Sequence, residues 1–481
     1  MISFSDEKLR EIAQLFSGRN LYRHDLVNFF FCTLADTPYF INTRRFNLGL
    51  LSLLPTLAVK RLKSRNHPVE AAIQEKFDYL FCILGDVSKE QDTLLPVISA
   101  LRERNESVLV IWLRSTPVPE KTLSELNGAT VFIPGTSGEM AGSFRGFVDD
   151  TFNSLSILFR GCYLLRKLDG WGTAFSPRGA WLFEQIFHLL RWERYFSHLL
   201  SNQTFRETAV VSETAVVTLA ICHVAIDNKW SPHHYLHGLP GLLHTRSLSH
   251  HIYCFSSAER NYFIRNGWDP SQVHADGHPR QNRFIQKIRQ LRTLEPQEGG
   301  LRILFASQPS IDGMGFYSDE YTAIQQAVIG VAERLGLGPE DLRIRLHPIE
   351  NDKRFIEIAA ERSLPEARSL LSNKSIEEDL AWANVVLTIA STVSIETAYS
   401  GGALIWLRFG RFHYEVREEL CDEGFGLSVS TEEELYQELT RLQDPTYRRI
   451  QIAKFLDTAR ALSVITPQRR NHSPHEPTGS I

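Results

Sequence analysis

The chain has 481 residues, of which 43% are hydrophobic and 22% are charged. These fractions lie near the averages of globular proteins, which excludes a disordered chain, a collagen-like repeat and a polytopic membrane protein. A chain of this length exceeds what one hydrophobic core usually supports, so we expect two domains. The formal net charge of −4 gives no global attraction for a polyanion, which argues against a dedicated nucleic-acid-binding protein.

The six cysteines are scattered and show none of the CxxC spacings of zinc or redox sites, so we interpret them as reduced core residues of a cytoplasmic protein. The charged start of the chain is unlike a secretory signal peptide. The apolar segment 48–59 is too short to span a bilayer and has basic flanks. We interpret it as a buried helix, and contact with the inner leaflet of the membrane is the alternative.

Short apolar runs alternate with helix-length segments from residue 77 onward, which indicates βαβ units and a parallel sheet. Two longer helical patterns interrupt this rhythm. We therefore predict an N-terminal Rossmann-like domain over residues 1–285, with a helical insertion at about 150–200. Its expected strands lie at 79–84, 108–113, 130–134, 209–212, 234–237, 251–255 and 273–276.

The charged segment 286–300 ends in Pro and Gly residues and is typical of a linker. A second α/β pattern follows and predicts a C-terminal Rossmann-like domain over residues 301–467. Its expected strands lie at 302–306, 343–346, 385–389 and 403–407. The tail at 468–481 has few apolar residues and is expected to be disordered.

Two doubly wound domains that face each other place the carboxyl ends of their strands, where ligands bind, on opposite walls of one cleft. In the second domain the strand 343–346 ends at His347. Pro348 restricts His347 to an extended conformation, which presents the imidazole at the mouth of the strand. There it can donate a hydrogen bond to a phosphate or leaving-group oxygen. The alternative is a histidine that only caps an edge strand.

The strand 385–389 runs into a hydroxyl-rich turn and then a helix, with Ser391, Thr392, Ser394 and Glu396 in that order. Free backbone N–H groups and the positive end of the helix dipole would suit a phosphate. Glu396 would accept hydrogen bonds from ribose hydroxyls. The alternative is an ordinary helix start with a Ser or Thr cap.

Turns of the first domain follow their strands in the same way and supply the opposite wall. The residues that we expect to line the cleft from this side are His237, Gly238, Ser256 and Arg280, the last within Gly277-His278-Pro279-Arg280.

The ordered series strand-His-Gly, Ser-x-x-Glu-Arg-x-x-Phe, Gly-His-Pro-Arg, strand-His-Pro and strand-Ser-Thr-x-Ser-x-Glu resembles the GT-B glycosyltransferases of bacterial capsule and surface-glycan assembly. It is similar to polysialyltransferase-like and Kdo-transferase-like enzymes, and CDP-glycerol glycerophosphotransferases share much of it. The resemblance covers about residues 205–430. It implies a CMP-sugar donor whose phosphate and cytidine are held by His347, Ser391, Thr392 and Ser394. With Pro348 and Glu396 these residues form the predicted donor site.

The sequence departs from several bacterial sialyltransferases because the acidic motif that supplies their general base is not visible in the N-terminal half. Glu213, after the strand 209–212, and Asp86, after the strand 79–84, are the predicted substitutes. His347 is the third predicted catalytic residue and would stabilise the departing phosphate. For each acid the alternative is an ordinary surface carboxylate.

The predicted function is inverting transfer of a sialic acid-like or Kdo-like sugar from a CMP-sugar to a surface polysaccharide or lipid-linked glycan. The alternatives are a nucleotide-sugar 2-epimerase on the same fold, a CDP-glycerol-type glycerophosphotransferase, and a non-catalytic glycan- or nucleotide-binding module. The two domains are expected to close on the donor about the linker.

We expect no cofactor and no metal. Six histidines fall within residues 233–251, but zinc needs three or four converging ligands. His233 and His234 are adjacent on a predicted strand, so they would face opposite sides of the sheet.

Overall fold

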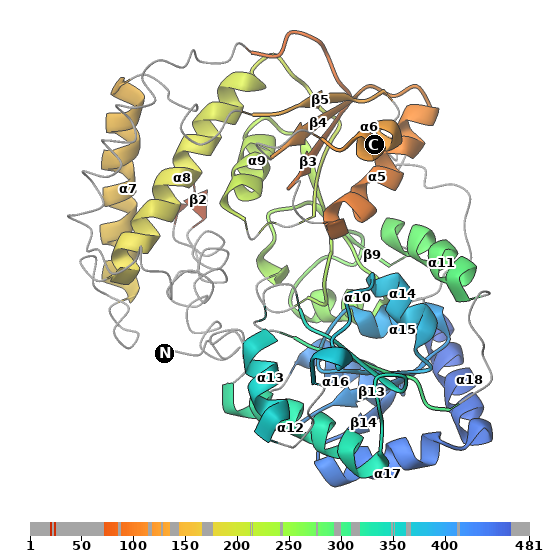
Figure 1. Ribbon diagram of the computed structural model, residues 1–481. Helices are drawn as coiled ribbons and strands as arrows, with labels where there is room; N and C mark the ends of the chain where they lie inside the picture. The colour runs from red at the N-terminus through yellow and green to blue at the C-terminus, as the bar shows by residue number, and fades with distance from the viewer. Residues whose placement is uncertain are drawn as a thin grey trace.

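The computed structural model describes residues 20–21, 24–25, 72–84, 88–113, 118–126, 128–134, 144–165, 177–211, 213, 215–240, 244–275, 278–292, 300–308, 318–347, 350, 352–361, 367–410 and 414–462. Asp86, Pro348, the apolar segment 48–59 and the tail 468–481 lie outside these residues. Two sheets, one above the other in Figure 1, organise the described part of the chain. Near the N-terminus β1 (Asn20–Leu21) pairs with β2 (His24–Asp25).

The first sheet has seven parallel strands in the order β5-β4-β3-β6-β7-β8-β9. They are β3 (Tyr79–Ile83), β4 (Val108–Trp112), β5 (Thr130–Phe132), β6 (Glu207–Val210), β7 (Ser231–Tyr235), β8 (His251–Tyr253) and β9 (Val273–His274). The strand order reverses between β3 and β6, which makes this the topological switch point where open α/β sheets bind ligands.

The second sheet has five parallel strands in the order β11-β10-β12-β13-β14. They are β10 (Ile303–Ala306), β11 (Leu342–Arg345), β12 (Val385–Thr388), β13 (Ala403–Leu407) and β14 (Leu427–Val429). Its switch point lies between β10 and β12. Every residue of β10, β12 and β13 is buried, as expected for parallel strands that are covered on both faces.

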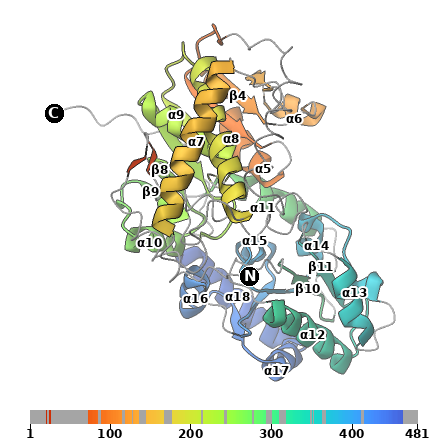
Figure 2. The same cartoon turned by 90° about the vertical axis from the view of Figure 1, so that its left-hand side faces the viewer.

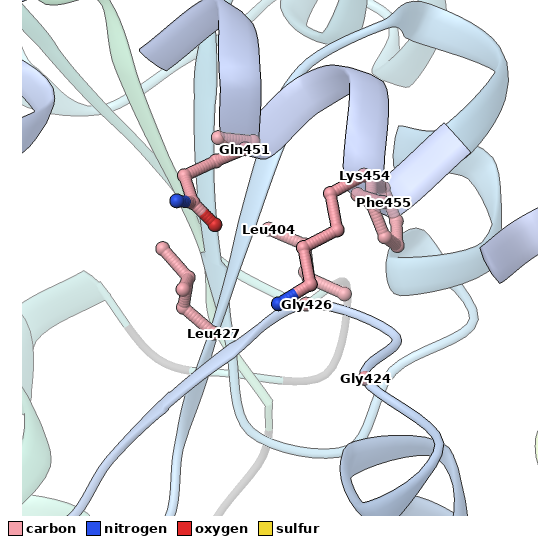
Figure 3. A pocket seen from close by; sticks show the side chains of 8 residues that line it. Leu404, Gly424, Gly426, Leu427, Gln451, Lys454 and Phe455 are labelled. Carbon is pink, nitrogen blue, oxygen red and sulfur yellow. The ribbon is translucent and has the colours of Figure 1, made fainter. Parts of the chain in front are cut away.

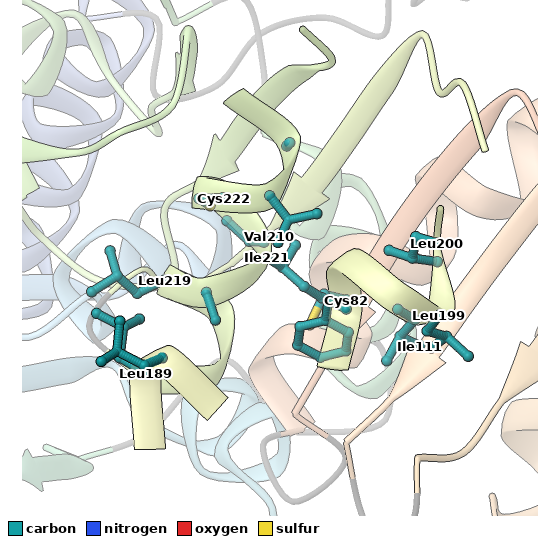
Figure 4. Packing of buried hydrophobic residues seen from close by; sticks show 14 of the residues in the cluster. Cys82, Ile111, Leu189, Leu199, Leu200, Val210, Leu219, Ile221 and Cys222 are labelled. Atoms are coloured by element: carbon teal, nitrogen blue, oxygen red, sulfur yellow. The ribbon is translucent and has the colours of Figure 1, made fainter. Parts of the chain in front are cut away.

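Helices cover both faces of the first sheet because successive side chains of a strand point to opposite sides. Tyr79, Phe81 and Ile83 of β3 pack with α5, whereas Leu80 and Cys82 pack with α8 and α9. Figure 4 shows this second core around Cys82. The helices of this part are α5 (Ser88–Glu103), α6 (Glu120–Glu125), α7 (Phe144–Leu165), α8 (Pro177–Leu199), α9 (Val216–Asp227) and α10 (Ser257–Arg265), with the 3-10 turn η2 (His244–Arg246).

The helical insertion predicted at about 150–200 is formed by α7 and α8. The helix α8 packs against α9 on one side and α7 on the other, so α7 is the outer layer, which Figure 2 shows in front of α8. The helices of the second part are α11 (Pro279–Arg292), α12 (Ser318–Leu335), α13 (Asp352–Glu361), α14 (Ile376–Trp382), α15 (Val393–Ser400), α16 (Glu415–Asp422), α17 (Glu432–Leu442) and α18 (Pro445–Ala461), with the 3-10 turn η3 (Ala367–Leu370).

The helix α11 spans the domain boundary predicted at residue 285. Phe284 and Ile288 pack with Leu304, Trp382 and Val393 on one face of the second sheet. The same helix also contacts α5, so it lies between a helix of the first sheet and the helix α14, as Figure 1 shows. Although the sequence after residue 285 is charged, the two apolar side chains of α11 fix this helix to the second sheet.

One apolar cluster joins the two halves of the molecule. Leu236 and Phe255 follow strands of the first sheet, and they share this cluster with Trp406, Leu420 and Phe455 of the second half. The residue after α18 also contacts the first half, because the N–H and hydroxyl of Ser257 both donate to the carbonyl of Leu462, at 2.9 Å each. Two doubly wound parallel sheets joined in this way form the GT-B fold that the sequence predicts.

Candidate functional site

Hydrogen bonds join three strand ends of the second sheet into a continuous rim, the donor rim, which consists of Ser307, Gln308, His347, Glu350 and residues 390–396. Beside the switch point, the side chain of Gln308 after β10 accepts the N–H of Ala390 after β12, at 2.7 Å. On the other side, Glu350 accepts the hydroxyl of Ser307 at 3.0 Å and the backbone N–H of His347 at 2.6 Å. The residues predicted as the donor site from β11 and β12 therefore lie on one connected edge.

His347 is half-buried at the end of β11, and a carboxylate holds its backbone. The same carboxylate, Glu350, also accepts a hydrogen bond from Tyr321. Burial raises the pKa of Glu350 to about 7, although the hydrogen bonds from His347 and Ser307 oppose this shift. Glu350 was not predicted as a site residue, and its only signal in the sequence is its place three residues after the histidine.

Polar groups of the turn between β12 and α15 form hydrogen bonds with one another. Ser394 is fully buried and donates its hydroxyl to the carbonyl of Ser391 at 2.6 Å. The Ser391 hydroxyl accepts the N–H of Val393 at 3.3 Å, and Thr392, which is also buried, is the N-cap residue. The N–H groups of residues 394–396 donate to the carbonyls of residues 391 and 392. The expectation of free N–H groups at this helix start is therefore wrong for residues 393–396.

Glu396 forms an ion pair with Arg280, and both side chains are buried. Glu396 lies in the first turn of α15, at the carboxyl edge of the second sheet, and Arg280 lies in the first turn of α11, which follows β9 of the first sheet. The pair therefore connects the carboxyl edges of the two sheets. Two residues predicted on opposite walls of the site are in direct contact.

Other residues predicted on the first wall lie at the end of β7. The Nδ1 atom of His237 lies 3.2 Å from the carbonyl oxygen of Val211. An added Cβ at Gly238 would meet no atom of the described residues within 4 Å. The next residue, Leu239, accepts the hydroxyl of Tyr414 at 2.6 Å, which is a further polar contact between the two halves.

Ser256 is fully buried and caps a helix. Its hydroxyl accepts the N–H of Glu259 at 3.4 Å, which makes it the N-cap of α10. Glu259 in turn accepts the N–H of Phe255 at 2.6 Å. Burial raises the pKa of Glu259 to about 8. The hydroxyl of Ser256 is thus directed at the backbone of its own helix.

Glu213 is buried just beyond β6, at the switch point of the first sheet. One carboxylate oxygen accepts the N–H of Leu248 at 2.8 Å, and the other accepts the hydroxyl of Ser249. These contacts tie the chain after β6 to the segment before β8. The role of Glu213 as a general base stays a prediction, and Asp86 lies outside the described residues.

Sequence reasoning did not single out Glu90, which lies on the other side of this switch point. It is 2% exposed, in the first turn of α5, and accepts the N–H of Leu84 at 2.6 Å. Burial raises its pKa to about 8, so the carboxyl group is largely protonated at neutral pH. An acidic residue in the first turn of a helix is common, so its sequence position alone does not reveal this environment.

His233 and His234 face opposite sides of β7, as predicted. The ring of His233 lies 3.2 Å from the hydroxyl of Tyr253, whereas the ring of His234 lies 2.9 Å from the carbonyl oxygen of Val211. Across the described residues, no group of three or more His, Cys, Asp or Glu side chains is arranged to hold a metal ion. None of the helices in the described ranges is long and apolar enough to cross a membrane.

A small pocket lies at the opposite edge of the second sheet, where β13 begins (Figure 3). Its lining residues are Ala403, Leu404, Gly424, Gly426, Leu427, Gln451, Lys454 and Phe455. Because ligands of open α/β sheets bind at the carboxyl ends of the strands, this pocket is separate from the candidate site.

No protein-family model matches this chain, and no curated protein matches its sequence. The fold is similar to that of solved structures. A putative UDP-N-acetylglucosamine 2-epimerase from Listeria monocytogenes is 12% identical, with coverage of 81% of this chain and 94% of its own, and the TM-score is 0.48. For a UDP-GlcNAc 2-epimerase from Methanocaldococcus jannaschii, in complex with UDP-GlcNAc and UDP, the corresponding values are 15%, 82%, 99% and 0.45. For a glycosyltransferase from Rickettsia africae they are 10%, 81%, 94% and 0.43.

Proposed function

We propose that this protein is an enzyme that binds a nucleotide-activated sugar at the donor rim and transfers the sugar to a glycan acceptor. The observation that carries this proposal is the connected edge around the switch point of the second sheet. There the ends of β10, β11 and β12 are joined by the hydrogen bonds of Gln308 and Glu350. Switch points of doubly wound sheets are where such folds bind nucleotides.

The chemistry of the rim suits a nucleotide sugar. His347 offers an imidazole beside the position proposed for the leaving phosphate, and its backbone is held by Glu350. A preorganised donor of this kind stabilises negative charge as it develops on a leaving group. Glu396, on the neighbouring helix, offers a carboxylate to ribose hydroxyls. The acceptor hydroxyl then needs a base from the first sheet, and Glu213 and Asp86 are the proposed candidates.

The finer assignment is a CMP-sugar donor with a sialic acid-like or Kdo-like sugar, and an acceptor that is a surface polysaccharide or a lipid-linked glycan. It rests on the resemblance of residues 205–430 to the capsule and surface-glycan transferases. The reaction proposed is inverting and independent of metal, with the leaving charge balanced by side chains.

Nucleotide-sugar 2-epimerisation is the second candidate. It would use the same nucleotide site without a glycan acceptor, and it requires acid and base groups beside the sugar. Glu90 and Glu213 lie on the two sides of the switch point of the first sheet, and the pKa of Glu90 is raised to about 8, which suits a proton donor. Two of the three solved structures reported above are described as 2-epimerases, the one from Listeria monocytogenes as a putative one, and the third as a glycosyltransferase.

The first test is thermal denaturation of the wild-type protein with CMP, CDP, UDP and GDP. A ligand that binds only the native state raises the apparent stability by about 2.7 kcal/mol at 100 times its dissociation constant. A rise with one base identifies the donor class: cytidine favours the CMP-sugar transferase, and uridine favours the 2-epimerase. If none of the four nucleotides shifts the transition at millimolar concentration, the proposal of a nucleotide-sugar enzyme is wrong.

The two activities are then separated by incubation with UDP-GlcNAc alone. Only the epimerase converts this compound without an acceptor, whereas a transferase requires a glycan for more than slow donor hydrolysis. Conversion at C2 in the absence of any glycan would replace the transferase proposal with the epimerase.

A further inference from the structure

Arg280 is a buried cation with unused hydrogen-bonding capacity. Its side chain is 5% exposed, and its Nη2 atom contacts Glu396. Within the described part of the chain, its Nε and Nη1 atoms have no hydrogen-bond partner. An arginine has five N–H donors, and leaving buried donors unpaired costs free energy that a ligand can recover.

Among the described residues, Arg280 forms its ion pair with Glu396. The ring of Phe284, one turn along α11, lies 5.6 Å from the centre of the guanidinium. His278, two residues before it, is fully buried and is held neutral, because burial and the charge of Arg280 lower its pKa to about 3. If the Glu396 carboxylate leaves Arg280 to bind another group, the buried guanidinium loses its counter-charge. A buried unpaired charge has a high free energy, and a bound anion would lower it.

The start of α15 cannot supply the whole phosphate site. The N–H groups of residues 393–396 already donate within their own turn, so the usual backbone donors of a helix N-terminus are occupied. Arg280 approaches this same helix start from the other sheet, through its contact with Glu396. Arg280, a side chain of α11, therefore places a positive charge beside the donor rim.

We infer that Arg280 is the phosphate-binding residue of the donor site, and that a phosphate of the bound nucleotide accepts hydrogen bonds from its Nε and Nη1 atoms. Glu396 is then released to the ribose hydroxyls. The inference rests on the proposed function, because it assigns one ligand group of the same nucleotide. It also gives α11 a functional role, since this helix brings a cation from the first sheet to the nucleotide on the second.

The test compares nucleosides with nucleotides by calorimetric titration of the full chain. The ligands are cytidine, CMP and CDP, and uridine, UMP and UDP. The quantity measured is the gain in affinity that the phosphate gives, which is the ratio of the dissociation constants of nucleoside and nucleotide. Charge-assisted hydrogen bonds of this kind contribute about 10- to 100-fold in affinity. The proteins compared are the wild type, Arg280→Gln and Arg448→Gln.

Arg448 is the matched control because it is also a buried arginine, but it lies in α18, where it donates to the carbonyl of Leu442 at 2.8 Å. We expect Arg280→Gln to lose most of the gain from the phosphate while keeping the affinity for the nucleoside, and Arg448→Gln to keep both. An Arg280→Gln protein with the wild-type ratio would overturn the inference and leave the proposed function intact. A wild type that binds neither nucleoside nor nucleotide would instead refute the proposed function.

Arg280→Lys covers the case in which Arg280→Gln does not fold. Its ammonium keeps the positive charge beside Glu396 but cannot reproduce the two nitrogen donors of the guanidinium. We expect a ratio that is about 10-fold smaller than that of the wild type. A wild-type ratio in a folded Arg280→Lys protein would overturn the assignment of Nε and Nη1 to the phosphate.

Discussion

Replacing Glu90 by Gln should change how the stability of the protein depends on pH. Burial raises the pKa of Glu90 from 4.5 to about 8. A carboxyl group with a raised folded-state pKa contributes stability that is fully present below pH 4.5 and lost as the pH rises toward 8. Over 2.5 pH units, from 4.5 to 7, this linkage corresponds to a loss on the order of 3 kcal/mol.

Gln has nearly the same shape as a protonated Glu and can still accept the N–H of Leu84, but it does not titrate. We therefore expect Glu90→Gln to match the wild type at pH 5 and to be more stable by several kcal/mol at pH 8. The assay is denaturant unfolding from pH 5 to pH 8, followed by near-ultraviolet circular dichroism. Glu103→Gln, on the exposed end of α5, is the control and should follow the wild-type curve. A constant difference in stability between Glu90→Gln and the wild type at every pH would show that the Glu90 carboxyl does not titrate with a raised pKa.

Three further predictions concern the candidate site and the second sheet. His347→Ala should lower donor turnover by about 100- to 1,000-fold while shifting stability by only about 0.5 kcal/mol, and near-normal initial rates in the folded variant would leave His347 as a simple strand cap. Turnover should persist in EDTA, because the imidazole and hydroxyls of the donor rim and the guanidinium beside it can balance the charge of the leaving phosphate without a metal ion; loss of activity that magnesium or manganese restores would contradict this. Gly426→Ala should destabilise the protein by more than about 1 kcal/mol, because φ is +99° and a Cβ would lie 2.9 Å from the Leu404 side chain, whereas a Cβ at Gly300 would meet no atom of the described residues within 4 Å; equal unfolding midpoints for Gly426→Ala and Gly300→Ala would contradict this steric expectation.

The strands were predictable because buried parallel strands are nearly continuous runs of apolar residues. The runs that became β3, β4, β10, β12 and β13 begin within one residue of their predicted starts. The strand β7 begins three residues earlier than predicted, since Ser231-Pro232-His233 is not an apolar run. The strand β14 was not predicted, because three residues on an edge carry too little pattern.

The site was predictable only as far as chain position determines it. A residue that follows a strand lies at the carboxyl edge of its sheet, and this places His347 and Glu396 on one edge of the second sheet and Arg280 on the facing edge of the first. Which groups are buried, and which are already paired, depends on contacts between distant segments. Thus neither the raised pKa of Glu90 nor the bond between Glu350 and the His347 backbone can be deduced from spacing.

The domain boundary, too, could be predicted from the sequence only in part. The charged residues after position 285 are typical of a linker, yet α11 continues to Arg292 and packs Phe284 and Ile288 on the second sheet. Phe284 and Ile288 are four residues apart, so they lie on the same face of the helix, and this face packs on the second sheet. The closure of the two domains on a donor stays a prediction. The apolar cluster that joins the two domains would be the contact about which they move.

Donor turnover with and without an acceptor decides whether this protein is a glycan-dependent transferase. The purified chain is incubated with CMP-sialic acid, CMP-Kdo and UDP-GlcNAc, in each case alone and with a surface-glycan oligosaccharide, and nucleotide release and sugar transfer are followed by mass spectrometry. We expect nucleotide release from one donor that depends on the glycan, with a matching mass increase of the glycan and loss of both in His347→Ala. A folded wild-type protein that neither binds nor converts any of the three nucleotide sugars would contradict this expectation.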